Sequence, residues 1–229
     1  MNYYDLKTYF LLFIIYSFLG WVLEVINSFI KEKKFINRGF LLGPLCPIYG
    51  FGTIAILVLL KDNADHPVSL FINAIFICSI LEYFTSFFME KLFNARWWDY
   101  SNRKFNINGR ICLETMIPFG LAAAFVWYIV NPQIINIINL LSSEVITTIT
   151  FILLGLLVID LLISFNVVYS YKKTINKIST RDITEDFNKY VKKLFESGPY
   201  LTRRLVFAFP KIDFQNLKEK LVLKIKNKK

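Results

Sequence analysis

Two apolar stretches of the chain each carry an acid, a serine and a second acid at intervals of four residues. These residues are Glu24, Ser28, Glu32, Glu82, Ser86 and Glu90. Intervals of four place each trio on one face of a helix. A carboxylate inside an apolar helix is costly unless it faces protein or water. The pattern therefore indicates either polar contacts that lock helices together or a path for a cation or proton.

The acids belong to a thirteen-residue segment that occurs in two similar copies in the chain. LEVINSFIKEKKF at 23–35 returns as LEYFTSFFMEKLF at 81–93, with seven identical positions. Asn37 and Asn108 follow the two copies, and each is followed by a proline ten residues later. We therefore predict a tandem repeat of a helix, a basic connection and a returning helix, with the two copies parallel. Chance similarity between two apolar helices is the alternative interpretation.

The composition is that of a membrane protein. Hydrophobic residues make up 55% of the 229 residues, and the mean hydropathy is +0.46. Several apolar runs approach the roughly 20 residues that a helix needs to cross a bilayer. We predict an all-α integral membrane protein whose first apolar segment is a retained helix and not a signal peptide. The five predicted crossings are residues 8–30, 40–60, 68–92, 111–131 and 145–171.

Two domains are predicted, a transmembrane domain at 1–171 and a cytoplasmic tail at 172–229. In the first, repeat A spans 8–60, repeat B spans 68–131, and the fifth helix spans 145–171. The net charge of +10 comes entirely from the tail. Apolar residues of the tail recur at helical spacing opposite charged ones. This favours basic amphipathic helices that lie on the anionic inner surface of the membrane or dock on a partner.

Basic residues alternate along the chain and predict its orientation. The four connections and the tail hold four, one, five, none and sixteen Lys or Arg residues in chain order. Positive residues accumulate on the cytoplasmic side, so we predict that the N-terminus lies outside. Pro132 is expected to end the fourth crossing, because proline disrupts a helix interior. The apolar segment QIINIINLL after it is then a short helix at the outer surface or a re-entrant one.

The candidate path or substrate-binding residues are those that lie within or beside the apolar runs or that recur in both copies of the repeat. They are Glu24, Glu82, Glu114, Asp160, Arg38, Arg110, Asn37 and Asn108. In the structural alternative, the acids pair with the two arginines or with Ser, Asn and Trp donors. The excess of acids over arginines favours a cationic cargo or proton coupling. Glu32 and Glu90, at the membrane edge, are expected to pair with the neighbouring lysines Lys33, Lys34 or Lys91.

Two further segments have unusual composition. NRGFLLGPLCPIYGFG at 37–52 carries four glycines and two prolines. It predicts a broken second helix that either offers backbone groups to a ligand or packs closely on a neighbour. The connection ARWWDYSNRKFNINGR at 95–110 is rich in aromatic residues, which suit either an interfacial belt or a loop that covers a site or docks a partner. Its candidate interface residues are Trp97, Trp98, Asp99 and Tyr100.

Several kinds of chemistry have no motif in the chain. It contains no P-loop, no zinc-protease motif and no nucleophile elbow,. Cys46, Cys78 and Cys112 are far apart and have no metal-ligand spacing,. We expect no enzyme activity, no cofactor and no metal site. The expected partners are membrane lipid and a second copy of the chain, and no nucleic acid.

Four motifs carry a resemblance to a known family. NRGFLLGPLCPIYGFG, LEYFTSFFMEKLF, WWDYS and FNINGRICLE resemble the bacterial family of putative ABC-transporter type IV permeases, over about residues 10–170. The resemblance implies a multi-pass protein of the bacterial cytoplasmic membrane that works with a separate ATPase. It brings no established binding residues to this chain. We expect a permease subunit with a polar path lined by the acids. The alternative is a scaffold or regulator that recruits partners through the aromatic loop and the tail.

Overall fold

The described chain is helical apart from one short hairpin and its connections. The computed structural model describes residues 4–63, 65–93, 96–175 and 204, so nearly all of the predicted tail lies outside the described residues. The helices are α1 (Leu6–Glu32), α2 (Pro47–Leu59), α3 (Pro67–Phe93), α4 (Leu113–Phe125), α5 (Asn131–Asn139) and α6 (Ser143–Ile175). A 3₁₀ turn η1 (Lys61–Asn63), a π-helical turn η2 (Val126–Val130) and the antiparallel strands β1 (Asn106–Ile107) and β2 (Ile111–Cys112) complete the order.

Four helical stretches in the described residues are long and apolar enough to cross a membrane. They are Leu6–Glu32, Pro67–Leu92, Leu113–Asn139 and Ser143–Val167. The predicted all-α membrane fold is confirmed to this extent. The second predicted crossing, 40–60, holds only the 13-residue helix α2, about 20 Å long at 1.5 Å per residue. Its first part is irregular because Pro44 and Pro47 cannot donate to a helical ladder, and α2 begins at Pro47, where a missing N–H is tolerated,.

Pro132 does not end the fourth helix, so that prediction is wrong. α4, η2 and α5 form one helical stretch from Leu113 to Asn139, and Val130 and Asn131 keep right-handed helical angles. In η2 the Asn131 N–H donates to the Val126 carbonyl, five residues back. This wider turn makes room for the proline ring, which would otherwise clash with the preceding turn. Most of QIINIINLL is therefore the last part of a long helix.

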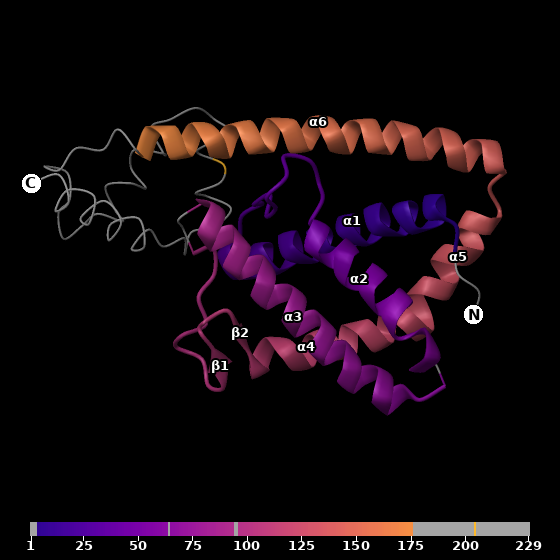
Figure 1. Ribbon diagram of the computed structural model, residues 1–229, viewed down its shortest axis with the longest axis horizontal. Helices are drawn as coiled ribbons and strands as arrows, with labels where there is room; N and C mark the ends of the chain where they lie inside the picture. The colour runs from indigo at the N-terminus through magenta and orange to yellow at the C-terminus, as the bar shows by residue number, and fades with distance from the viewer. Residues whose placement is uncertain (1–3, 64, 94–95, 176–203, 205–229) are drawn as a thin grey trace, which may run out of the picture.

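The helices pack as two pairs with a long outer helix. α1 packs mainly on α2, α3 packs mainly on α4, and α6 lies along α1 (Figure 1). An apolar core joins the first turns of α1 and α3 to the last turn of α2 and to η2 and α5. Its members include Leu12, Leu60, Leu70, Trp127 and Ile138. Because these are opposite ends of successive elements, neighbouring elements run antiparallel.

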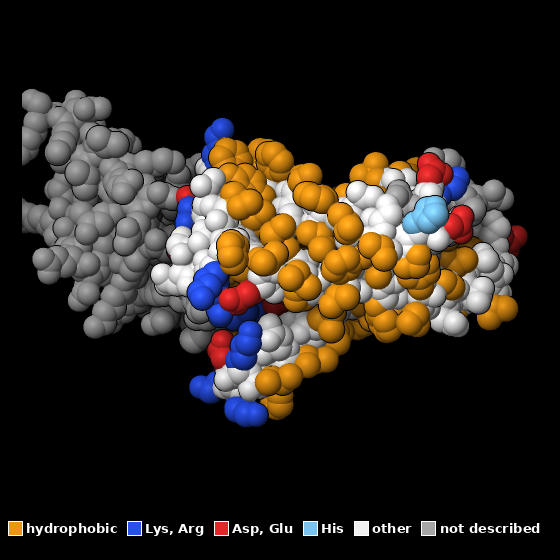
Figure 2. All heavy atoms as spheres, turned by 90° about the horizontal axis from the view of Figure 1, so that it is seen from below, with side chains coloured by type: hydrophobic (Ala, Val, Ile, Leu, Met, Phe, Trp, Pro, Cys, Tyr) orange, Lys and Arg blue, Asp and Glu red, His pale blue; other side chains and the backbone are white. Residues whose placement is uncertain are grey.

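Apolar side chains also cover much of the outside. Figure 2 shows a broad apolar band over the middle of one face, with charged side chains gathered toward its two ends. On α6 the exposed apolar residues include Phe151, Ile152, Leu156 and Leu162. An apolar surface of this extent would be a liability in water, and it suits the hydrocarbon of a bilayer.

Candidate functional site

The two repeated inner acids each accept a hydrogen bond from a tyrosine. Glu24, on α1, accepts from the Tyr49 hydroxyl of α2 at 2.7 Å. Glu82, on α3, accepts from the Tyr100 hydroxyl of the following connection at 3.3 Å. The two carboxyl groups are close enough to interact electrostatically. The structure therefore joins both acids in one polar cluster between the two helix pairs.

Glu82 is the most enclosed acid of this cluster. Its residue is 6% exposed, and Thr115 Oγ1 lies 3.5 Å from its second oxygen. The Thr115 proton is better placed for the Cys112 carbonyl, at 2.9 Å. In the described part of the chain Glu82 forms no ion pair. A buried carboxylate without a cation is costly, so this group is stable as the neutral acid or beside a bound cation.

The repeated outer acids pair with arginines from the connections that follow them. Arg38 Nη2 lies 3.5 Å from Glu32, and its Nη1 lies 3.9 Å from Glu24. Arg110 Nη2 lies 2.8 Å from Glu90. Lysine partners were predicted for Glu32 and Glu90, whereas the ion pairs seen here for both acids are with arginines. A lysine one or two positions along a helix does not face the glutamate, whereas an arginine on the connection can fold back over it.

Arg110 is the more enclosed of the two arginines. Its side chain is 10% exposed, against 26% for Arg38. Arg110 Nη1 also donates to the Ser86 hydroxyl at 3.2 Å. Its guanidinium lies 5.4 Å from the ring centroid of Phe87 and 5.7 Å from that of Tyr83. This charge is thus held by an acid, a hydroxyl and two aromatic faces.

Asp160 binds the backbone of the irregular segment and no cation in the described chain. Its two oxygens accept from the amides of Leu42 and Gly43, each at 2.8 Å. The Ser164 hydroxyl donates to it at 3.0 Å. The broken second helix was predicted to offer free backbone groups or to pack closely on a neighbour. In the structure the backbone amides of Leu42 and Gly43 are occupied by the Asp160 side chain of α6, so they are not free for a ligand.

The remaining predicted path residues contact neither inner acid within the described part of the chain. Asn37 accepts from Trp21 Nε1 at 2.7 Å and donates to the Leu42 carbonyl at 2.9 Å. Asn108 donates to the Tyr83 hydroxyl at 2.9 Å. Glu114 pairs with Arg103 at 2.9 Å, and both side chains are more than half exposed. These contacts brace the connections, and the structure does not bring the three residues together with Glu82.

The aromatic connection is folded inward. Trp97 is buried and packs on Phe40, with ring centroids 6.5 Å apart. Trp98 Nε1 donates to the Arg110 carbonyl at 3.1 Å. Tyr100 reaches the acid cluster, where burial and the nearby Glu82 carboxyl raise its pKa well above the ordinary value,. Asp99 is the exposed member of the four.

Tyr49 and Thr115 belong to the cluster although neither was predicted from the sequence. A signal for Tyr49 exists in Gly20, four residues before Glu24 on the same helical face,. A side chain at Gly20 would collide with the Tyr49 ring. The glycine therefore lets the tyrosine cross α1 and reach the acid one turn farther on. Thr115 has no comparable signal, since its position depends on how α4 starts after β2.

The chain belongs to the family described as "Putative ABC-transporter type IV", which it matches over residues 11–165. The match covers both helix pairs and most of α6, and it bears out the resemblance noted from the motifs. No curated protein and no solved structure matches the chain. With four helices able to span a bilayer, family and fold together describe a multi-pass membrane protein related to ABC transporters.

Proposed function

We propose that the chain, as a member of this family, is the membrane-spanning permease subunit of a transporter. Its path passes the cluster of Glu24, Tyr49, Glu82 and Tyr100, which takes a proton or a small cation. The chain has no P-loop, so a separate ATPase supplies the energy and the chain itself catalyses no reaction. A second copy, packed against the exposed apolar length of α6, encloses the path.

The proposed topology has five crossings in a bacterial cytoplasmic membrane. In it the irregular segment 39–46 and α2 together make the second crossing, and the N-terminus lies outside. The antiparallel course of successive elements supports this assignment. So does the gathering of basic residues in the connections before α2 and α4, since positive residues favour the cytoplasmic side.

The observation that carries the proposal is the environment of Glu82. This acid is 6% exposed, and in the described residues it contacts hydroxyl groups but no cation, while the Glu24 carboxyl lies near it. A purely structural acid at this depth would be expected to have a charged partner, as Glu90 has in Arg110,. Two acids that share one polar cluster are suited to hold a single positive charge between them.

Ion flux through vesicles tests the role of the acids. The purified chain is reconstituted in liposomes that contain pyranine, and proton movement is followed after an imposed K⁺ or Na⁺ gradient. Glu82→Gln should lower the flux to the level of empty vesicles, and Glu24→Gln should lower it in part. Glu114→Gln, which removes an exposed acid, is the matched control and should leave the flux unchanged. Flux in Glu82→Gln and Glu24→Gln equal to that of the parent would rule out the path.

Purification from the native membrane in mild detergent tests the partner. Mass spectrometry should find an ATPase with a P-loop in stoichiometric amount. In that case the flux assay is repeated with the complex and ATP. A homo-oligomer without an ATPase would reject the ATPase-driven form of the proposal.

One observation favours the alternative function, a scaffold or regulator. The tip of the connection between α3 and α4 exposes Phe105 (79%) and Ile107 (52%) beside Arg103 and Lys104. An exposed apolar tip with basic neighbours is suited to a partner protein. This reading predicts that deletion of residues 172–229 abolishes the cellular phenotype while the two glutamine substitutions leave it intact. The permease function predicts instead that Glu82→Gln abolishes the cellular phenotype.

A further inference from the structure

The irregular segment 39–46 has backbone groups that need partners from elsewhere in the chain. It is not helical, so its amides and carbonyls have no ladder of their own. Such backbone is tolerated at membrane depth only where protein or a water-filled cavity surrounds it. Leu41 is completely buried within the segment, which places these groups in protein. Their partners therefore decide whether the segment keeps this conformation.

The amide side of the segment is bound by α6 and α1. Asp160 of α6 accepts from Leu42 and Gly43 at 2.8 Å each. The Cys46 amide donates to the Ser17 carbonyl of α1 at 2.9 Å. A methyl group at Gly43 would lie only 2.8 Å from Asp160, so glycine is needed for the carboxylate to come this close.

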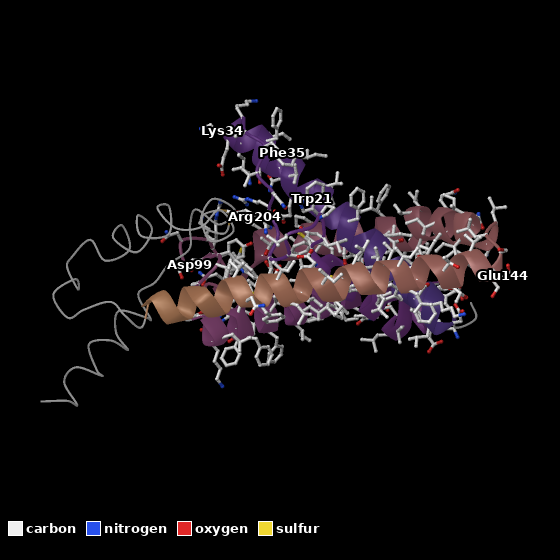
Figure 3. All side chains as sticks on the ribbon, turned by 90° about the horizontal axis from the view of Figure 1, so that it is seen from above. Trp21, Lys34, Phe35, Asp99, Glu144 and Arg204 are labelled. Carbon is white, nitrogen blue, oxygen red and sulfur yellow. The ribbon has the colours of Figure 1, made fainter. Side chains whose placement is uncertain are left out.

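The carbonyl side is bound by an arginine from the far end of the chain. Arg204 Nη2 donates to the Gly39 carbonyl at 2.8 Å, and the same nitrogen bonds the Leu41 carbonyl. Arg204 lies between Trp21 and Asp99 in the view of Figure 3. More than 160 residues separate it from these carbonyls along the chain.

We infer that the carbonyls of Gly39 and Leu41 form a docking site for the guanidinium of Arg204, which clamps segment 39–46 onto α6. Asp160 holds the segment's amides and Arg204 holds its carbonyls. Phe40, between them, packs on Phe165 of α6 with ring centroids 5.6 Å apart. Withdrawal of Arg204 leaves two carbonyls unsatisfied and releases the segment.

The clamp has a consequence for the acid cluster. Arg38 precedes the segment and contacts Glu24 and Glu32, while Tyr49 follows it and donates to Glu24. Release of segment 39–46 therefore frees both groups that hold Glu24. Docking of Arg204 thus regulates access to that acid. The clamp itself does not depend on transport, and its test uses no flux measurement.

A native cysteine reports the state of the clamp. Cys46 is 8% exposed, and its thiol donates to the Arg38 carbonyl at 3.1 Å. In a full-length chain with Cys78→Ala and Cys112→Ala, Cys46 is the single thiol. The rate at which a small maleimide modifies it in native membrane vesicles measures the opening of the segment.

Arg204→Ala should raise the Cys46 modification rate about tenfold or more, the effect of losing a hydrogen bond to a charged group on local opening. Guanidine at non-denaturing concentration should restore protection, whereas urea at the same concentration should not. Arg103→Ala removes a more exposed arginine and is the matched control, with no expected change. A Cys46 rate within about twofold of the parent in Arg204→Ala would overturn the inference, since a lost charged hydrogen bond exceeds that difference.

A second variant decides the question if Arg204→Ala cannot be obtained folded. Arg204→Lys keeps the charge but lacks the planar guanidinium fork. The Cys46 rate should rise in this variant by about threefold or more, the loss of one neutral-strength hydrogen bond. A rate equal to that of the parent would overturn the docking of a guanidinium on these carbonyls.

Discussion

The first helix pair, α1 and α2, and the second pair, α3 and α4, make similar contacts around their acids, although the partner residues stand at different places in the two pairs. In each pair the inner acid accepts from a tyrosine, and the outer acid pairs with an arginine of the next connection. A glycine of the returning helix also faces the same two positions in both pairs. Gly50 meets Phe13 and Ser17, and Gly120 meets Phe71 and Ile75, positions that are 58 residues apart like the two copies of the thirteen-residue segment.

The pairs differ in the connection before the returning helix. In the second pair this connection is a hairpin whose polar groups are satisfied locally. Trp98 bonds the Arg110 carbonyl, and the Tyr100 amide bonds the Gly109 carbonyl at 2.7 Å. In the first pair the irregular segment depends on Asp160 and Arg204, both distant in the chain. The returning helix is correspondingly short in the first pair and long in the second.

This difference indicates a division of roles. The connection of the second pair is held by bonds within itself and to the adjacent helix α3, so we expect the second pair to be the more rigid half. A connection held by remote groups changes state when those groups move, because stability is not uniform across a fold. The first pair is therefore the half in which movement can be controlled, and the acid that it carries, Glu24, is the one whose surroundings can change.

The largest expected effect is the difference in unfolding free energy between variants of the two arginines, Arg110 and Arg38. Arg110→Ala should cost about 3 kcal/mol of unfolding free energy, because it leaves the partly buried Glu90 with one fewer cation and empties the space between two aromatic rings,. Arg38→Ala should cost about 1 kcal/mol, since this arginine is more exposed and its ion pairs are longer. Denaturant titration of both variants in lipid nanodiscs measures the difference. Equal losses would contradict the view that the second pair is the rigid half.

The next effect concerns the support of the first pair. Asp160→Asn should destabilise segment 39–46 by about 2 kcal/mol, because an amide group cannot accept from both backbone amides. Hydrogen exchange of the peptide that contains Leu42 and Gly43 should become faster, and exchange of the hairpin at 98–110 should not change. Glu144→Gln alters an exposed acid in the first turn of the same helix and is the control. Equal acceleration in both connections would show that they are not independent.

The glycines sharpen the comparison at matched positions. A methyl group at Gly50 would lie 2.5 Å from the Phe13 carbonyl oxygen, which is part of the rigid helix backbone. A methyl group at Gly120 would lie 2.5 Å from Cγ1 of Ile75, a side chain that can rotate away. Gly50→Ala should therefore cost about 3 kcal/mol and Gly120→Ala about 1 kcal/mol, within the usual range for overpacking. Thermal unfolding of the two variants tests this, and a larger loss in Gly120→Ala would contradict it.

The sequence predicts the parts of this fold that depend on short-range patterns. Apolar runs predict the long helices, and the depth of Glu24 and Glu82 within those runs predicts that both acids face protein or water. Helix geometry alone could also have excluded Lys33 as the partner of Glu32, because a residue at the next position of a helix does not face it. Pro132 was misjudged because a π-helical turn, which no local pattern announces, accommodates it,.

The contacts that join distant parts could not be predicted. Asp160 binds the backbone amides of Leu42 and Gly43. Every residue except proline has such an amide, so the side chains at these positions do not identify them as partners of Asp160. The same holds for Arg204 and its two carbonyls. The meeting of Glu24 with Glu82 depends on how one helix pair packs on the other, and sequence spacing describes only each pair by itself.

The smallest expected effect concerns an acid in the hairpin of the second pair. Asp99 accepts from the Ser101 amide at 3.0 Å, from the Ser101 hydroxyl at 2.6 Å and from Arg96 at 3.3 Å. Burial acts to raise the pKa of Asp99, but these hydrogen bonds and the charge of Arg96 outweigh it and lower that pKa below the ordinary value. The stability that Asp99 contributes is therefore complete above about pH 4, the ordinary pKa of aspartate, and is lost as the pH falls through the lowered value.

Asp99→Asn should consequently weaken the hairpin at pH 7 and matter less as the pH falls below about 4. The side chain is 42% exposed, so solvent screening holds the expected loss to about 0.5 kcal/mol. Hydrogen exchange of the Tyr100 amide, corrected for intrinsic rates, measures it at several pH values. Asp62→Asn, in the connection at the opposite end, should leave this amide unchanged. A difference between Asp99→Asn and the parent that persists undiminished at pH 3 would mean that the side chain supports the hairpin by shape and not by charge. The hydrogen bonding within the hairpin of the second pair would then not depend on the charge of Asp99.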